Sequence, residues 1–140
     1  MRKKITFLLI YWLPPLVTAG IIFQLSSGTA PRTSDIYWQD FVVKKTAHVV
    51  IYGILAVLIY RALLAEGKPP KRAAISAFLL AAFYGATDEI HQHFTQGRES
   101  RLRDVGFDAI GACLSIFFTI KILPRLPSGI VKIGKRLEII

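Results

Sequence analysis

The feature that most constrains this chain is the arrangement of its apolar residues in four long blocks. The first block holds 21 residues without a formal charge, and a hydrocarbon core about 30 Å thick requires roughly 20 helical residues. This block is therefore long enough to cross a membrane unaided. The other three reach that length only if their polar end residues lie at the membrane boundary or inside a bundle. The blocks are Ile5–Leu25, Thr46–Tyr60, Ala73–Thr87 and Val105–Leu123.

The pattern predicts an all-α fold, a polytopic bundle of four transmembrane helices in residues 1–123 followed by a basic tail at 124–140. A length of 140 residues suits one domain. A cleaved signal peptide is the competing interpretation of the first block, because Arg2, Lys3 and Lys4 precede it. The block is longer than the apolar region of a usual signal peptide, which favours a retained helix.

The basic residues predict that the N- and C-termini are both cytoplasmic. In that orientation 12 of the 18 Lys and Arg residues lie on the cytoplasmic side and six on the outer side, as the positive-inside rule requires. The net charge of +9 is then a topology signal, and no nucleic acid partner is expected. The tail either lies on anionic lipid headgroups or is solvated. Seven of the nine carboxylates fall at the outer end: Asp35, Asp40, Asp88, Glu89, Glu99, Asp104 and Asp108.

Polar side chains mark one face of each of the first two helices near this outer end. Gln24 and Ser27 are three residues apart and share a face of the first helix. Lys45, His48 and Tyr52 are spaced i, i+3, i+7 and share a face of the second. Lys45 could reach the membrane surface and Tyr52 could belong to an aromatic belt. Neither explanation applies to His48, so a functional role for this face is favoured.

The third helix ends in neighbouring carboxylates, Asp88 and Glu89, which point about 100° apart. Asp88 and Gln92 share a face. Carboxylates near hydrocarbon are costly unless paired, so these two either serve a function or form an ion pair with Lys45 or an arginine. Arg98 and Arg101 follow in a short loop and could hold a phosphate or carboxylate, or simply neutralise the acids.

The fourth helix carries Asp104, Asp108, Gly111 and Ser115 along a single stripe. Asp104 either caps the start of the helix or joins the polar site. Asp108 lies one turn deeper, and an intramembrane carboxylate is a functional candidate. Gly111 is expected to let another helix come close.

Together these motifs resemble the VanZ-like family of small bacterial membrane proteins, over about Ile5 to Leu123. The chain departs from the family at Asp108, where the family often has Asn. The resemblance implies a multi-pass protein of the bacterial cytoplasmic (inner) membrane, linked in founding members to resistance to glycopeptides such as teicoplanin. It does not supply a reaction. The segments that carry it are Gln24/Ser26/Ser27, Lys45-x-x-His48-x-x-x-Tyr52, Asp88-Glu89-x-x-Gln92, Gly97-Arg98, Asp104, and helix four around position 108 and Gly111.

Two functions compete. The first is an enzyme acting at the outer leaflet on a lipid-linked or cell-wall substrate, because titratable groups in a partly dry site suit acid/base chemistry. The second is a non-enzymatic module that binds an envelope lipid or antibiotic, or supports a partner membrane protein. A transporter is a third, less favoured interpretation. The predicted catalytic residues are His48, Asp88 and Glu89, and the predicted substrate-binding residues are Gln24, Ser27, Lys45, Tyr52, Gln92, Arg98, Arg101, Asp104 and Asp108.

The expected partners are membrane lipid and either a lipid-linked cell-wall precursor or a glycopeptide, and a homo-oligomer stays open. No cofactor is expected, because the chain has no Gly-rich phosphate loop. No metal site is expected either, because His91 and His93 diverge by about 200° on a helix.

Overall fold

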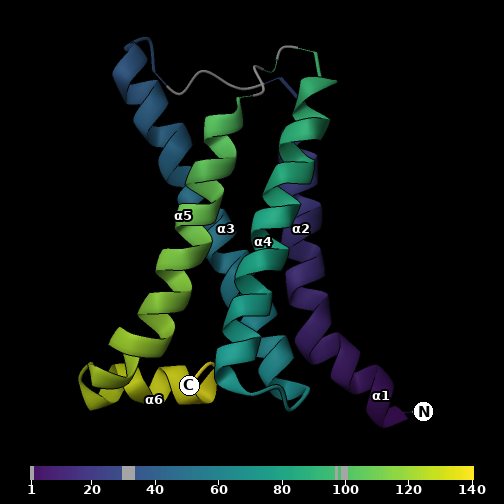
Figure 1. The fold of residues 1–140 in the computed structure, drawn as a ribbon, viewed down its shortest axis with the longest axis vertical. Coiled ribbons are helices and arrows are strands. Elements are labelled where there is room, and N and C mark those ends of the chain that lie inside the picture. The colour runs from purple at the N-terminus through teal and green to yellow at the C-terminus, as the bar shows by residue number, and fades with distance from the viewer. Residues whose placement is uncertain (1, 30–33, 97, 99–100) are drawn as a thin grey trace.

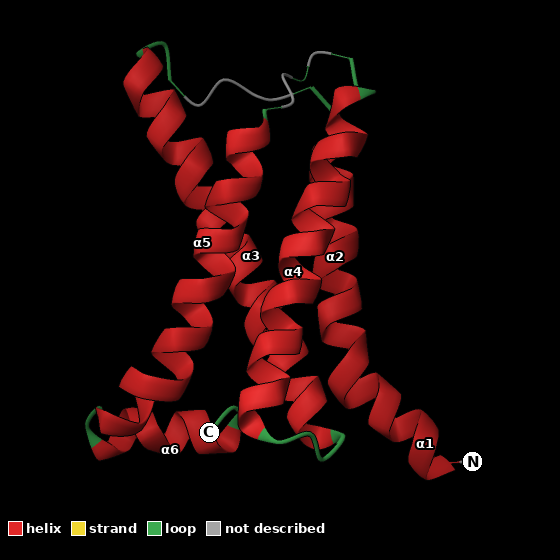
Figure 2. Ribbon diagram, viewed as in Figure 1, coloured by secondary structure: helices red, strands yellow, loops and turns green. Residues whose placement is uncertain are grey.

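The structure, a computed structural model, describes residues 2–29, 34–96, 98 and 101–140. All regular secondary structure in this part of the chain is helical, as Figure 2 shows, so the predicted all-α fold is confirmed. Four helical segments are long and apolar enough to cross a membrane: Lys4–Ser26, Tyr37–Ala65, Pro70–His93 and Leu102–Arg125. The α-helices are α1 (Arg2–Phe7), α2 (Leu13–Ser26), α3 (Tyr37–Ala65), α4 (Pro70–His93), α5 (Leu102–Phe117) and α6 (Ser128–Arg136).

The first span joins α1 to α2 through a π-helical turn at Leu8–Trp12. Pro14 and Pro15 stand at the start of α2 and have no N–H for the preceding turn. The carbonyl of Ile10 is the one that an N–H at position 14 would have met. It instead accepts a hydrogen bond from Arg61 Nη1 of α3 at 3.2 Å. A side chain from another helix thus replaces the backbone donor that proline lacks.

Helix α3 begins at Tyr37, nine residues before the predicted block at Thr46. The sequence pattern places Lys45 on this helix but starts the apolar block only at Thr46, because Asp40, Lys44 and Lys45 are charged. Inside the structure these charges are paired, since Lys44 Nζ lies 2.7 Å from Asp40 Oδ2 one turn earlier. At 1.5 Å per residue α3 is about 43 Å long, more than a hydrocarbon core requires.

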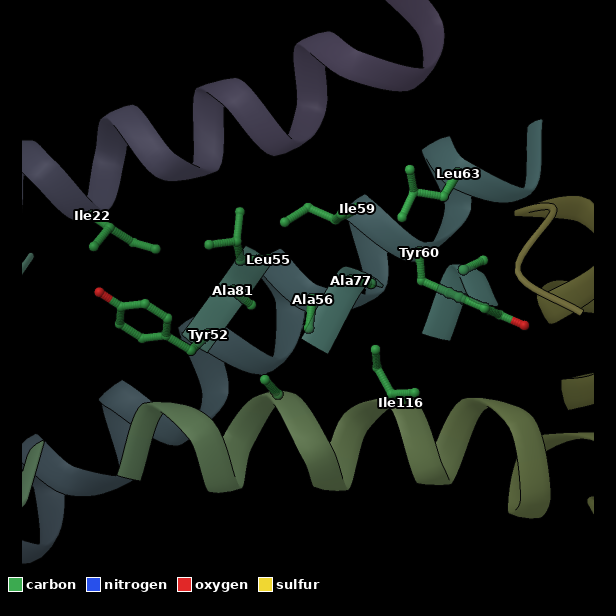
Figure 3. Packing of buried hydrophobic residues seen from close by; sticks show 12 residues of the cluster. Ile22, Tyr52, Leu55, Ala56, Ile59, Tyr60, Leu63, Ala77, Ala81 and Ile116 are labelled. Carbon is green, nitrogen blue, oxygen red and sulfur yellow. The ribbon is translucent and has the colours of Figure 1, made fainter. Parts of the chain in front are cut away.

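The apolar core lies where α3 packs between α4 and α5. Figure 3 shows Leu55 and Ile59 of α3 facing Ala77 and Ala81 of α4, with Ile116 of α5 alongside. All five side chains are buried. Alanines on α4 bring its backbone close to α3, because small residues allow tight packing between membrane helices.

Helices α3 and α5 cross closely at two glycines. A Cβ atom on Gly111 would overlap the backbone of Val49, and a Cβ on Gly53 would overlap the Ser115 side chain. The prediction that Gly111 lets another helix approach is therefore confirmed.

The two ends of the bundle differ. Figure 1 shows the N- and C-terminal ends of the chain and the turn between α3 and α4 together at one end, here called the termini end. Helix α6 runs across this end, crosswise to the spans. The opposite end is called the cleft end, and it contains the end of α2, the start of α3, the end of α4 and the start of α5. The predicted tail at 124–140 thus contains a helix.

Candidate functional site

A cavity of about 720 Å³ opens at the cleft end, between residues of α2, α3, α4 and α5. We call it the cleft. Eight of the twelve predicted site residues line it, so the structure brings these eight together at one cavity. The eight are Lys45, His48, Tyr52, Asp88, Gln92, Arg98, Arg101 and Asp104. Glu89, Gln24, Ser27 and Asp108 are not part of the lining.

His48 is held from behind by Asp108. The two groups meet at 2.8 Å between His48 Nδ1 and Asp108 Oδ1, and Asp108 is only 1% exposed. An ionised carboxylate only accepts hydrogen bonds, so beside ionised Asp108 the hydrogen is on Nδ1, and Nε2 has no hydrogen-bond partner within the described residues. Gly85 of α4 makes room for this acid, because a Cβ there would lie 2.9 Å from Asp108 Oδ2. The hydrogen-bond partner of His48 is thus buried, and its second nitrogen is available.

Lys45 joins α3 to α5 one turn nearer the cleft end. Its Nζ lies 2.5 Å from Asp104 Oδ2, and 5.7 and 5.8 Å from the ring centroids of Phe41 and Phe107. Two aromatic faces add cation–π attraction to the ion pair. Asp104 therefore does not cap α5, whose cap position is Arg101.

Asp88 joins α4 to α2. Its Oδ2 accepts hydrogen bonds from Ser26 Oγ and from Gln92 Nε2, both at 2.8 Å, and all three side chains are buried. Of the two alternatives for Asp88, an ion pair with Lys45 is not the one that the structure shows, because Lys45 is paired with Asp104 and the donors to Asp88 Oδ2 within the described residues are neutral. Asp88 Oδ1 and the hydroxyl of Tyr52 are buried beside the cleft and complete no hydrogen bond within the described residues.

Ser26 is one of the polar lining residues that the sequence analysis did not propose for the site; the others are Tyr37, Asp40, Lys44 and Arg103. Gln24 and Ser27 were chosen because they share a face, but both are exposed and outside the lining. Ser27 Oγ donates to the carbonyl of Phe23 at 2.7 Å and lies 3.1 Å from His91 Nε2. Successive residues on a helix differ by about 100°, so only Ser26 faces Asp88.

The two predicted arginines lie near the ends of helices. Arg98 Nε donates to the carbonyl of Gly28 at 2.7 Å, and its Nη2 donates to the carbonyl of Leu25. This guanidinium closes the exposed end of α2, and its Nη1 has no hydrogen-bond partner within the part of the chain that the structure describes. The backbone N–H of Arg101 donates to Glu89 Oε1, so Glu89 holds the start of α5. Gly97 of the Gly97-Arg98 motif lies outside the described residues.

The histidines of α4 lie apart from the cleft lining. His91 stacks on Phe23 with ring centroids 4.6 Å apart, and His93 packs edge-on against Phe94 at 5.4 Å. Within the described residues, no three His, Cys, Asp or Glu side chains gather closely enough to hold a metal ion.

Comparison with known proteins gives one match. A sequence profile of the family described as VanZ/LLP1 matches residues 3–123, which include all the residues of the cleft and stop before α6. No curated protein and no solved structure shows a significant match to the chain.

Proposed function

The chain belongs to the VanZ/LLP1 family and is a membrane protein with four candidate spans; on that premise, we propose that the cleft is the active site of an enzyme acting on a lipid-linked or cell-wall substrate. The observation that carries the proposal is His48 at the cleft wall with Asp108 behind it at 2.8 Å. A histidine oriented by a buried carboxylate is suited to move a proton during reaction.

The other lining residues complement this role. His48 Nε2 takes or delivers the proton, and Asp108 fixes the ring. Asp88 Oδ1 accepts a hydrogen bond from a substrate hydroxyl or amine, because this oxygen is buried beside the cleft without a partner. Arg98 and Arg101 bind an anionic group such as a phosphate, since both line the same cavity. Lys45 stays paired with Asp104 and holds α3 against α5 at the cavity wall.

We further propose that both termini are cytoplasmic and that the cleft opens toward the outer side of the bacterial cytoplasmic membrane. Twelve of the 18 Lys and Arg residues belong to the termini end, and short cytoplasmic loops carry the excess of such residues. An outward cleft suits an envelope substrate and a contribution to glycopeptide resistance. Labelling single cysteines at positions 34 and 68 in intact cells with an impermeant thiol reagent tests this orientation. Label at 68 but not at 34 would contradict it.

Turnover tests the enzymatic proposal directly. Purified protein in lipid nanodiscs is incubated with an excess of a polyprenyl-phosphate-linked cell-wall precursor, and precursor and products are followed by mass spectrometry. We expect several turnovers per protein. His48→Gln should lower the rate of product formation by at least about 100-fold. His93→Gln is the matched control, because His93 is exposed and lies outside the cleft. Teicoplanin resistance of cells expressing each variant is measured in parallel.

The alternative is a binding module without a reaction, and one observation favours it. The cleft polar groups join two pairs of helices, as a structural network would: Lys45–Asp104 and His48–Asp108 join α3 to α5, and Ser26–Asp88 joins α2 to α4. In that case the precursor or teicoplanin binds, no product forms, and His48→Gln lowers the stability of the protein instead of a rate. Absence of turnover by wild-type protein that binds the precursor would sink the enzymatic proposal.

A further inference from the structure

Helix α6 lies outside the residues that match the family and does not depend on the function of the cleft. Two prolines precede it: Pro124 in the short 3₁₀ turn at Leu123–Arg125, and Pro127 immediately before the helix. Proline at these positions ends one helix and starts the next. The chain therefore leaves the last span and turns along the termini end, where Figure 1 shows α6 crosswise to the bundle.

The sequence of α6 has two opposite faces. At about 100° per residue, Ile133, Gly134 and Leu137 all lie within about 60° of Ile130. Lys132, Lys135 and Arg136 lie on the other side of the helix. A short helix with this split is the kind that lies in a membrane interface.

The apolar face points toward the bundle, yet the bundle covers only part of it. Gly134 is buried, and a Cβ atom there would lie 2.8 Å from Ile140 and 3.0 Å from Leu123. On either side of this contact, Ile133 is 58% exposed and Leu137 52%. These side chains lie at the termini end of the bundle, where α6 runs crosswise to the spans.

A second contact fixes this placement. Glu138, just beyond α6, accepts a hydrogen bond from Arg61 Nη2 at 3.2 Å. The Arg61 guanidinium also lies 4.8 Å from the ring centroid of Tyr11 and bonds the carbonyl of Ile10. The end of the tail is thus attached to two spans, and α6 is not a freely solvated segment.

We propose that α6 is an interfacial helix and that anionic membrane lipid covers its exposed apolar and basic faces. Ile130, Ile133 and Leu137 enter the boundary between headgroups and acyl chains, and the basic face made by Lys132, Lys135 and Arg136 binds anionic headgroups. Charge complementarity carries the choice of lipid, because the only acid near these three basic residues, Glu138, is paired with Arg61 among the described residues.

Depth measurements on the full chain test this proposal. Single cysteines are introduced at 133 and 132 in a Cys113→Ser background and carry a fluorescent label. The protein is reconstituted in vesicles of phosphatidylcholine, with or without phosphatidylglycerol. Ile75→Cys, on the exposed face of α4, is the lipid control, and Lys68→Cys, in the turn between α3 and α4, is the water control.

We expect acyl-chain bromines to quench the label at 133 as strongly as the label at 75. Iodide should quench the labels at 132 and 68 alike. Equal quenching of the 133 and 68 labels by iodide would overturn the proposal and show a solvated tail. Protection at 133 that disappears when the protein is diluted into more lipid would also overturn it, because a second copy would then cover the face.

The anionic preference is tested with Lys132, Lys135 and Arg136 all changed to Gln. In vesicles with phosphatidylglycerol, the 133 label of this variant should be quenched by bromine less than in the unchanged chain. Without phosphatidylglycerol the two should agree. If the variant and the unchanged chain differed equally in both vesicle types, or did not differ in either, headgroup binding would be refuted. Unchanged bromine quenching of the label at 75 shows that the variant is folded.

Discussion

The cleft end and the core half of the bundle are built from the same helices by opposite means. In the core, Leu55 and Ile59 pack on the alanines of α4. At the cleft end the helices are joined through Lys45–Asp104 and His48–Asp108. Buried charges contribute little net stability compared with apolar packing. The cleft end is therefore less closely packed than the core, and it contains a cavity lined with acid/base groups.

The largest expected effect on stability comes from the crossing of α3 and α5, which lies between the core and the cleft end. Gly111→Val should lower the free energy of unfolding by about 3 kcal/mol, because its side chain would overlap the backbone of Val49. Gly106→Val on the same helix is the control, since a Cβ there meets nothing within 4 Å. Unfolding by SDS in mixed micelles measures both. Similar losses for the two variants would show that α3 and α5 do not cross at Gly111.

A core truncation should affect stability without affecting the cleft. Leu55→Ala is expected to cost about 2–3 kcal/mol, since it leaves a cavity in packed surroundings. Precursor binding by the folded fraction should not change. Ile54→Ala, on the exposed face of α3, should change stability by less than about 0.5 kcal/mol. If the two variants were equally destabilised, the core would not be where the structure places it.

The ion pair at the cleft end gives an intermediate effect. Lys45→Met should cost about 2 kcal/mol, because it leaves buried Asp104 with only the longer, 3.9 Å ion pair to the exposed Arg103. Lys44→Met should cost less than about 0.5 kcal/mol, since the Lys44 side chain is 31% exposed against 14% for Lys45. The double variant Lys45→Met/Asp104→Leu should recover most of the loss. A double variant less stable than Lys45→Met would contradict the pairing.

The neutral hydrogen bond between α2 and α4 gives the smallest effect. Ser26→Ala should cost about 1 kcal/mol, because Asp88 Oδ2 loses a buried donor. Ser27→Ala should cost less than about 0.5 kcal/mol, since its hydroxyl bonds within its own helix turn and its contact with His91 Nε2 is exposed to solvent. The same unfolding assay separates the two serines. A larger loss for Ser27→Ala would reverse their assignment.

The sequence predicted what helical periodicity alone determines. Spacing placed Lys45, His48 and Tyr52 on one face, and the cleft brings all three together. Apolar blocks located four spans, because the length needed to cross a membrane is fixed. The glycine at the α3–α5 crossing was also found, since only a residue without a side chain allows so close an approach.

What the sequence could not predict depends on how one helix is rotated and shifted against another. Lys45 had several carboxylates to choose from, and only the packing of α3 on α5 selects Asp104. Ser26 was passed over because the side of α2 that faces Asp88 is set by tertiary contacts. The start of α3 at Tyr37 was missed because Asp40 and Lys44 interrupt the apolar pattern, although the two are paired within the helix.

The most direct test of the acid/base site is nitrogen NMR of the His48 imidazole in lipid bilayers, assigned by comparison with His48→Gln. We expect Nδ1 to carry a hydrogen and its nitrogen resonance to shift in Asp108→Asn. The Nε2 resonance should shift when the lipid-linked precursor is added. Imidazole resonances that respond to neither change would contradict this site, because His48 would then face neither Asp108 nor the ligand.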